Sequence, residues 1–209
     1  MLIKVPSVAN LGLETIKVDV EVNLAERGLP GFDIVGLADK AVAESKDRVR
    51  TAILSSEINF PTKKITVNLA PADVPKEGSM YDLPIALGIL SSIQEFPIPE
   101  ESLFMGELSF DGSLRHTKGA FLMALYAKEF GFKKLFLPKE SANEAAAIKD
   151  VKVFPVENLV QLCMHLTGAK DIAVRKPRVS MTHAAGSDTM MNTIMNDIAR
   201  KPTARSETP

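Results

Sequence analysis

The sequence predicts an α/β domain with some α+β character, because strand-like and helix-like segments alternate along most of its length. Residues 15–24 alternate apolar and polar side chains with the period of two that is typical of a half-buried strand. Residues 83–93 are instead apolar on nearly every side, which predicts a deeply buried helix. A composition of 45% apolar and 24% charged residues is that of a globular protein with a substantial core.

The first half of the chain predicts two opening strands followed by alternating strands and helices. The expected elements are strands at 2–9, 15–24 and 32–35, a helix at 39–56, a strand at 64–69 and a helix at 83–93. Gly36 is expected to end the third strand. Asp82 is the expected N-cap of the last helix, and Pro84 fits its first turn because an N–H there has no helical partner.

The second half predicts shorter elements. They are strands at 104–108 and around Leu114, a helix at 119–130, a strand at 134–137, a helix at 141–148, a strand at 151–154 and a helix at 156–166. Asp111-Gly112 predicts a tight hairpin turn, and Gly131 predicts a left-handed helix end. Ser141 and Glu144 match the capping-box pattern at the start of a helix.

The apolar periodicity lapses after Gly168. We therefore expect one domain over residues 1–168 and a divergent tail over 169–209, with one short helix at 188–201. Residues 1–168 carry 18 basic and 22 acidic side chains, and the tail carries 7 and 4, so their net charges are −4 and +3. The overall net charge of −1 gives no sign of a basic nucleic-acid-binding protein.

Cysteine usage and the terminal sequence indicate the compartment. A single cysteine, Cys163, excludes an intrachain disulfide, and its helix-like apolar surroundings predict a buried structural thiol. No signal-peptide pattern follows Lys4, and no apolar run approaches the roughly 20 residues that span a bilayer. We therefore expect a cytoplasmic protein without membrane contact.

Several segments, taken in chain order, carry a resemblance to a known family. They are GLPGFDIVGL (28–37), AVAESKDRVR (41–50), ITVNLAPAD (65–73), KEG (76–78) with YDLPIAL (81–87), GELSFDG (106–112) and LP (137–138). Together they resemble the N-terminal domain of Mg-chelatase-like AAA+ ATPases of the ComM/YifB type, over about residues 1–168. Ala38 stands where this family commonly has proline.

This resemblance implies a two-layer α/β fold related to the Lon protease domain, the C-terminal domain of RadA, GHMP kinases and a ribosomal protein domain. It also implies a hexameric motor that acts on DNA, in which a following AAA+ module binds ATP and Mg²⁺. The 209 residues contain no G-x-x-x-x-G-K-S/T motif, so we expect no cofactor in this chain. After about Ile172 the sequence departs from the family, as a truncation, a frameshift or a single-domain protein would.

The comparison with Lon-type peptidases indicates the catalytic state. The resemblance places Met80 where those enzymes have the nucleophilic serine and Phe121 where they have the lysine base, and neither side chain can perform those roles. The offset pair Ser79 and Lys118 remains as an alternative dyad, but one position at a helix start turns a side chain by about 100°. We therefore expect a non-catalytic domain whose former cleft is packed by Met80 and Phe121, with a Lon-like Ser/Lys peptidase as the alternative.

Metal binding is not expected from the sequence. The three histidines lie far apart, and no pair has the spacing of metal ligands. Asp73, Glu77 and Asp82 gather around one loop and could contact Mg²⁺, but capping and salt bridges with Lys76 are the favoured interpretation.

Basic residues supply the candidate contacts to a partner or to DNA phosphates: Lys46, Arg48, Arg50 and Lys76. The competing interpretation is a solvated face with salt bridges to neighbouring acids. We find no interleaving of basic and aromatic residues, so we do not expect sequence-specific recognition of nucleic-acid bases. The predicted function is an interaction or regulatory domain of a DNA-linked AAA+ ATPase, with the AAA+ module in cis or trans as partner. A free-standing DNA-binding module is the weaker alternative, because the domain is net negative.

Overall fold

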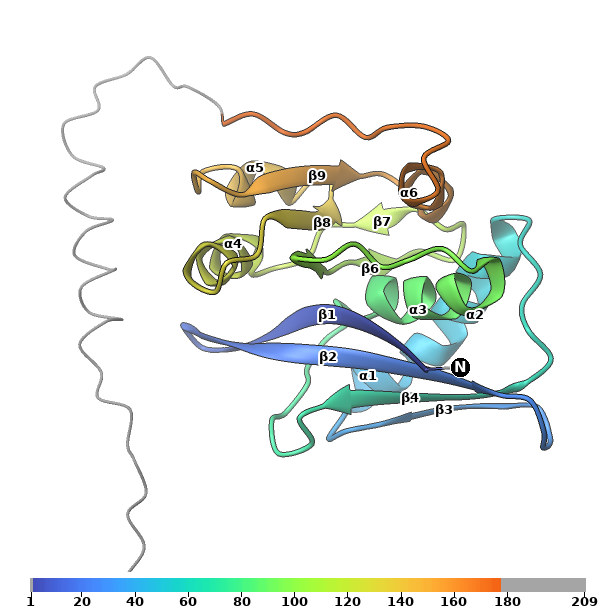
Figure 1. Cartoon of the computed structure of the whole chain (residues 1–209). Coiled ribbons are helices and arrows are strands. Elements are labelled where there is room, and N and C mark those ends of the chain that lie inside the picture. Colours follow the sequence, from blue (N-terminus) through green and yellow to red (C-terminus); the bar gives the residue numbers. More distant parts are fainter. Residues whose placement is uncertain (1, 178–209) are drawn as a thin grey trace, which may run out of the picture. The chain divides into compact units, whose positions relative to one another are not determined.

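The computed structural model describes residues 2–177 (Figure 1). This part of the chain is a mixed α/β structure with nine strands and six helices, in which antiparallel and parallel sheets both occur. The tail helix predicted at 188–201 lies outside the described residues. None of the helices within residues 2–177 is long and apolar enough to cross a membrane.

The first sheet contains four strands in the order β1-β2-β4-β3. They are β1 (Leu2–Leu11), β2 (Glu14–Ala25), β4 (Lys64–Ala70) and β3 (Gly31–Val35). Neighbours β1, β2 and β4 are antiparallel, whereas β3 runs parallel to β4. Val20 is in register with Val5 on one side and Leu69 on the other, and all three are fully buried. The alternation in residues 15–24 therefore faces a shared core, as predicted.

Helix α3 (Asp82–Gln94) packs on the buried face of this sheet, beside α2 (Ser45–Ser55) (Figure 1). Ten of its residues are buried, which confirms the prediction of burial on nearly every side. Gly88 allows the close approach, because a Cβ at this position would lie 2.4 Å from Cγ2 of Val22.

The helix predicted at 39–56 is divided into α1 (Lys40–Ala43) and α2 (Ser45–Ser55). Asp39 caps α1 by accepting a hydrogen bond from the Val42 N–H at 2.7 Å. The carbonyl of Ala41 accepts from Nη2 of Arg48 at 2.9 Å. A side chain thus satisfies one of the free carbonyls at the end of α1, so the chain can turn at Glu44 before α2 begins.

A second, parallel sheet has the order β5-β8-β9, with strands β5 (Ser102–Phe104), β8 (Lys134–Pro138) and β9 (Lys152–Val156). Phe104, Phe136 and Phe154 lie in register across the three strands. Their rings stack with centroid separations of 4.8 and 4.7 Å. Helix α4 (Ala120–Glu129) connects β7 (Leu114–Arg115) to β8 and agrees with the predicted helix at 119–130.

The hairpin predicted at Asp111-Gly112 is confirmed by β6 (Glu107–Leu108) and β7 (Leu114–Arg115), which are antiparallel. The single strand predicted at 104–108 is wrong, because Met105 and Gly106 separate β5 from β6. Gly106 instead donates its N–H to the Met80 carbonyl at 2.8 Å and accepts from the Leu83 N–H at 3.0 Å. These bonds tie the break between the strands to the start of α3.

The capping box predicted at Ser141 does not form. Ser141 precedes α5 (Ala142–Ala145), but its hydroxyl accepts from the Thr117 N–H and donates to the Thr117 carbonyl, both at 3.0 Å. Because this hydroxyl serves Thr117, the first turn of α5 lacks its side-chain cap, and the helix has four residues rather than the predicted eight.

Helix α6 (Leu159–Leu166) begins later than predicted, because Val156 completes β9. Asn158 caps it by accepting from the Gln161 N–H at 2.8 Å. Cys163 on this helix is buried, as predicted, and burial raises the pKa of its thiol to about 11.

The described chain stays attached to the domain beyond Gly168. Ile172 is buried in the hydrophobic core that also contains Val20 and Leu69. The Arg175 N–H donates to the Val153 carbonyl at 2.7 Å. The boundary expected at 168 therefore falls inside the packed structure rather than at its edge.

Candidate functional site

A cleft of about 710 Å³ lies where the loop before α3, the segment before α4 and the turn after β1 come together. Its lining includes Ser79, Met80, Glu107, Thr117 and Lys118. This is the place where the sequence predicted a packed interior. Met80 and Phe121 are only half-buried. Both pack against the hydrophobic core between the second sheet and α4, which contains Leu135 and Met123. The prediction that these two side chains close the cleft is therefore wrong.

Ser79 and Lys118 both line the cleft, but the structure does not assemble them as a dyad. The Ser79 hydroxyl donates a short hydrogen bond to Oε2 of Glu107, on β6. None of the hydrogen bonds within residues 2–177 joins Ser79 to Lys118, whose side chain is exposed. In the Ser–Lys arrangement of Lon-type peptidases the lysine amine takes the serine proton, whereas here that proton is directed to the Glu107 carboxylate. Glu107 was not a predicted site residue, although it lies in the motif at 106–112.

The segment that carries Lys118 is held from two sides. Ser141 binds both backbone groups of Thr117, and Nε2 of His116 lies 3.3 Å from Oε1 of Glu144 on α5. Gly119 has a φ of +92°, and a Cβ at this position would lie 2.2 Å from Nδ2 of Asn10 at the end of β1. The wall of the cleft at this segment is therefore fixed by packing against β1 and α5.

Arg48 and Asp82 form an ion pair beside this region. Nε of Arg48 lies 2.6 Å from Oδ2 of Asp82, and Nη2 lies 3.1 Å from Oδ1. The Asp82 side chain is 0% exposed, and its Oδ2 also accepts from the Leu108 N–H at 3.1 Å. Burial raises the pKa of Asp82 more than the hydrogen bond and the charge of Arg48 lower it.

This ion pair corrects two predictions. Asp82 is not the N-cap of α3, since that position belongs to Tyr81 and no side chain caps it. Arg48 was a candidate contact to a partner or to phosphate, but its guanidinium is engaged by Asp82, Ser45 and the Ala41 carbonyl. Arg48 therefore stabilises contacts within the domain in this structure.

Lys76 is also occupied inside the domain. Its side chain is fully buried, and Nζ donates a short hydrogen bond to the Pro71 carbonyl. Burial lowers the pKa of Lys76, and the charge of Asp73 opposes that effect. The ammonium group is therefore placed to fix the loop 71–76, and it is not accessible to a partner.

Lys46 and Arg50 remain at the surface of α2. The Arg50 guanidinium carbon lies 5.3 Å from the centroid of the Phe60 ring, which is a cation–π geometry. With Arg48 paired and Lys76 buried, the four predicted contacts do not form one basic patch. Within residues 2–177 no group of three or more His, Cys, Asp or Glu side chains is placed to hold a metal ion.

Comparison with known proteins gives the relationships of the chain. Residues 20–141 match the family described as subunit ChlI of Mg-chelatase. Competence protein ComM of Haemophilus influenzae is 36% identical over 186 residues, which are 87% of this chain and 36% of that protein. The uncharacterized protein YifB of Escherichia coli is 37% identical over 182 residues, covering 86% of this chain and 36% of YifB.

A more distant similarity reaches DNA repair protein RadA of Aquifex aeolicus, with 31% identity over 110 residues, 52% of this chain and 24% of RadA. The chain spans about a third of the length of the curated relatives ComM and YifB. The family motifs that the sequence carries at 28–37, 65–73 and 106–112 all fall within the matched region. The chain belongs to the family of subunit ChlI of Mg-chelatase and is homologous to ComM and YifB over most of its length.

Proposed function

We propose that this chain is a non-catalytic interaction or regulatory domain of a Mg-chelatase-like AAA+ ATPase that processes DNA in the cytoplasm. The observation that carries the proposal is the chemistry of the cleft. The Ser79 hydroxyl is bonded to Glu107, and Met80 and Phe121 hold the positions that the resemblance to Lon assigns to serine and lysine. A site of this kind can bind and position a partner, but within residues 2–177 no hydrogen bond pairs Ser79 with a lysine base.

Fold and sequence similarity support the rest of the proposal. A mixed sheet covered by a buried helix and joined to a parallel sheet is consistent with the two-layer Lon-like fold. The relatives named for competence and for DNA repair support a link to DNA processing. No Walker-type motif occurs in the 209 residues, so ATP and Mg²⁺ belong in this proposal to an AAA+ module acting in cis or trans, and hexamer formation belongs to that module.

The test measures whether the chain acts on such a module. The full chain is added to E. coli YifB from which the region homologous to this chain has been removed, and DNA-stimulated ATP hydrolysis is followed. A change of about twofold or more that saturates with the added chain supports an interaction or regulatory role. Unchanged hydrolysis at every concentration of the added chain, together with no co-elution of the two proteins, contradicts it.

The peptidase alternative has a separate test, because Ser79 and Lys118 both line an open cleft. Casein or a fluorogenic peptide is incubated with the wild-type chain and with the Ser79→Ala variant. We expect no cleavage by either protein. Cleavage by the wild type that disappears in the Ser79→Ala variant would replace the proposal with a Ser79–Lys118 peptidase.

A further inference from the structure

One end of the cleft is formed by the start of helix α4. Four residues of this segment line the cleft: Thr117, Lys118, Gly119 and Leu122. The first turn of the helix therefore faces the cleft. Gly119 is the N-cap residue, and no side chain caps the helix. Among residues 2–177, the N–H groups of residues 119–122 have no hydrogen-bond acceptor. Free N–H groups at a helix start, together with the helix dipole, attract an anionic group.

Thr117 gives an independent indication that this end of the cleft holds a ligand. Thr117 is only 6% exposed, and its Oγ1 has no hydrogen-bond partner. In the described part of the chain two buried side-chain atoms lack a partner, and of these only the one on Thr117 belongs to the cleft. Ser141 holds both backbone groups of Thr117, so the Thr117 hydroxyl has no part in anchoring the segment. A buried hydroxyl without a partner is unfavourable, and an acceptor atom of a ligand would supply the missing partner.

The charges around the cleft favour a ligand group with a single negative charge. Lys118 is exposed, and none of the ion pairs found within residues 2–177 includes it, so its ammonium group is available to an anion. Other parts of the lining are acidic and contain Asp39, Glu77 and Glu107. These carboxylates repel a doubly charged phosphate more strongly than a singly charged carboxylate.

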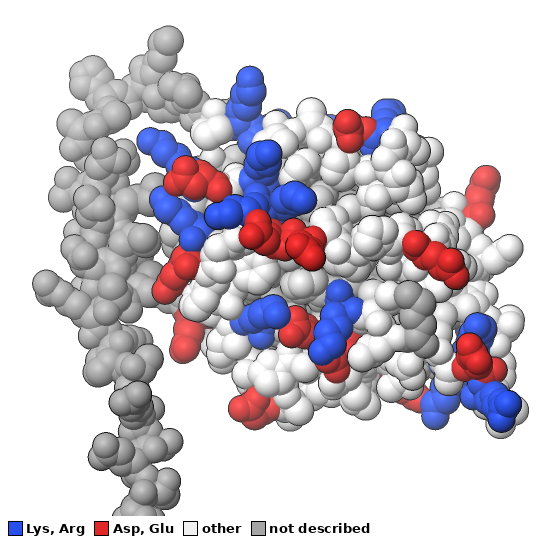
Figure 2. All heavy atoms as spheres, viewed as in Figure 1, with Lys and Arg blue, Asp and Glu red and all other residues white. Residues whose placement is uncertain are grey.

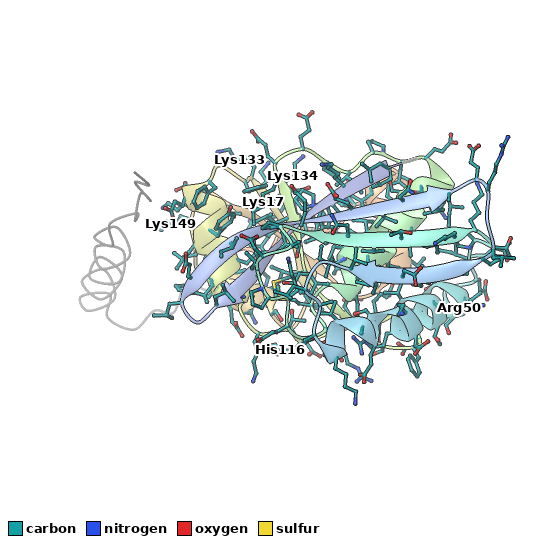
Figure 3. The ribbon with its side chains drawn as sticks, turned by 90° about the horizontal axis from the view of Figure 1, so that it is seen from below. Lys17, Arg50, His116, Lys133, Lys134 and Lys149 are labelled. Atoms are coloured by element: carbon teal, nitrogen blue, oxygen red, sulfur yellow. The ribbon has the colours of Figure 1, made fainter. Side chains whose placement is uncertain are left out.

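The basic side chains in view do not form a continuous area for a polyanion. Figure 2 shows Lys and Arg side chains interspersed with Asp and Glu over the face that it draws. Figure 3 shows His116, which precedes Thr117, away from both Lys149 and Arg50, and these two lie at opposite ends of the domain. Nε2 of His116 also has an acidic neighbour, since it lies 3.3 Å from Oε1 of Glu144. A nucleic acid, which needs several adjacent cations, is therefore not the expected ligand of the cleft.

We propose that the α4 end of the cleft binds one carboxylate group of a peptide, either at its C-terminus or on an acidic side chain. The carboxylate oxygens accept hydrogen bonds from the free N–H groups of the first turn of α4 and from Oγ1 of Thr117. Lys118 supplies the positive charge. Hydrogen bonds to an ionised group are about twice as strong as those between neutral groups, so the carboxylate should dominate the affinity.

The rest of the lining suits the other parts of a peptide. Met80 and Leu122 are half-buried at the cleft and offer contacts to an apolar residue next to the carboxylate. Glu77 is exposed at the cleft and can attract a basic residue of the peptide. The choice of a peptide over a free carboxylate rests on the proposed function, in which the domain interacts with a protein module.

The test follows the amide signals of the isotope-labelled full-length chain by NMR during titration with two pairs of peptides. The first pair is acetyl-Lys-Gly-Leu with a free or an amidated C-terminus, and the second is the amides of acetyl-Lys-Gly-Glu and acetyl-Lys-Gly-Gln. In at least one pair, the carboxylate peptide should bind with a dissociation constant of about 0.1 to 1 mM and shift the amide signals of residues 119–122. Its neutral counterpart should bind about tenfold or more weakly. The pair that shows the difference identifies the source of the carboxylate.

Substitutions separate binding from folding. Thr117→Val should weaken binding of the carboxylate peptide about threefold or more, because one hydrogen bond is lost. The urea midpoint of the free protein should stay equal or rise, because the hydroxyl has no partner there to lose. Lys118→Ala should weaken binding about twofold to fivefold and reduce its dependence on salt. Lys149→Ala is the matched control, since Lys149 is exposed and lies away from the segment of His116 (Figure 3), and it should bind like the wild type.

Equal binding of both members in both pairs, or signal shifts that leave residues 119–122 unchanged, overturns the inference. Wild-type affinity of Thr117→Val, or a lower urea midpoint for this variant, overturns the role of Thr117. Inorganic phosphate that binds more tightly than the carboxylate peptides overturns the assignment to a carboxylate, and acetate that binds as tightly overturns the assignment to a peptide. Each of these results leaves the ATPase test of the proposed function unaffected, because that test measures action on the AAA+ module and not peptide binding in the cleft.

Discussion

Replacement of Arg48 by methionine tests the ion pair that links α2 to the start of α3. Arg48→Met keeps the apolar stem of the side chain but removes the two hydrogen bonds, at 2.6 and 3.1 Å, to the carboxylate of Asp82. That carboxylate is 0% exposed and would keep the Leu108 N–H and the Ser45 hydroxyl as partners, but no charge. Loss of one member of a buried pair costs about 3 to 5 kcal/mol. This is a large part of the roughly 5 to 15 kcal/mol that typically stabilises a domain.

The effect should depend on pH in a defined direction. Burial already raises the pKa of Asp82 above its ordinary value of 3.8, and the loss of Arg48 raises it further. The folded protein then binds this proton more tightly than the unfolded chain does. Stability therefore falls as pH rises from the unfolded pKa through the folded one. Arg48→Met should therefore lower the free energy of unfolding more at about pH 8 than at about pH 5. At the higher pH the buried Asp82 carboxyl must either ionise without a cationic partner or hold its proton against the pH, and both are unfavourable.

Urea unfolding followed by far-UV circular dichroism at both pH values measures the free energy of unfolding. Arg50→Met is the matched control, because Arg50 lies on the same helix with an exposed guanidinium and should cost no more than about 1 kcal/mol. The double variant Arg48→Met/Asp82→Asn should recover much of the loss, since it removes the unpaired charge. A loss below about 1 kcal/mol for Arg48→Met at the higher pH, or an equal loss at both, would refute the reasoning.

Two further substitutions and one labelling experiment probe the packing. Gly88→Ala should destabilise the domain by about 1 to 3 kcal/mol in urea unfolding, because the new Cβ would lie 2.4 Å from Cγ2 of Val22; an unchanged midpoint would contradict the close approach. Ser141→Ala should cost about 2 to 4 kcal/mol by the same assay, because two buried backbone groups of Thr117 lose their partner, and a neutral result would show that water replaces the hydroxyl. Cys163, whose thiol pKa is about 11, should react with a thiol reagent slowly in the native protein and rapidly in urea. Rapid native labelling would argue against its burial.

The elements with a strong local pattern were predictable from the sequence. Strand β2 and helix α3 agree with the predictions because their periodicity comes from a core that lies on one side of β2 and around α3. The errors arise where a group outside the local repeat binds a backbone N–H or carbonyl. The division of the first helix follows from the bond of Arg48 to the Ala41 carbonyl, and the break between β5 and β6 follows from the bonds of Gly106 to Met80 and Leu83.

The candidate site was less predictable, because side-chain burial depends on the assembled fold. Lys76 has the sequence context of an exposed loop lysine, yet the Pro71 carbonyl binds its ammonium group inside the domain. Glu107 takes the Ser79 hydroxyl although 28 positions separate the two residues. No local pattern encodes contacts of this kind.

Helix α3 has a consequence for the order in which the chain can fold on the ribosome. One side of α3 covers the four-stranded sheet, and the other meets the later segment at Gly106, which lies against Leu83. When the first 94 residues have emerged, the sheet and α2 can pack on α3, but the part of α3 that meets Gly106 is still bare. The nascent chain must shield that surface until residues 102–108 arrive. Residues 95–101 thus act as a tether within one core, and fragments cut there would have to reassociate to become stable.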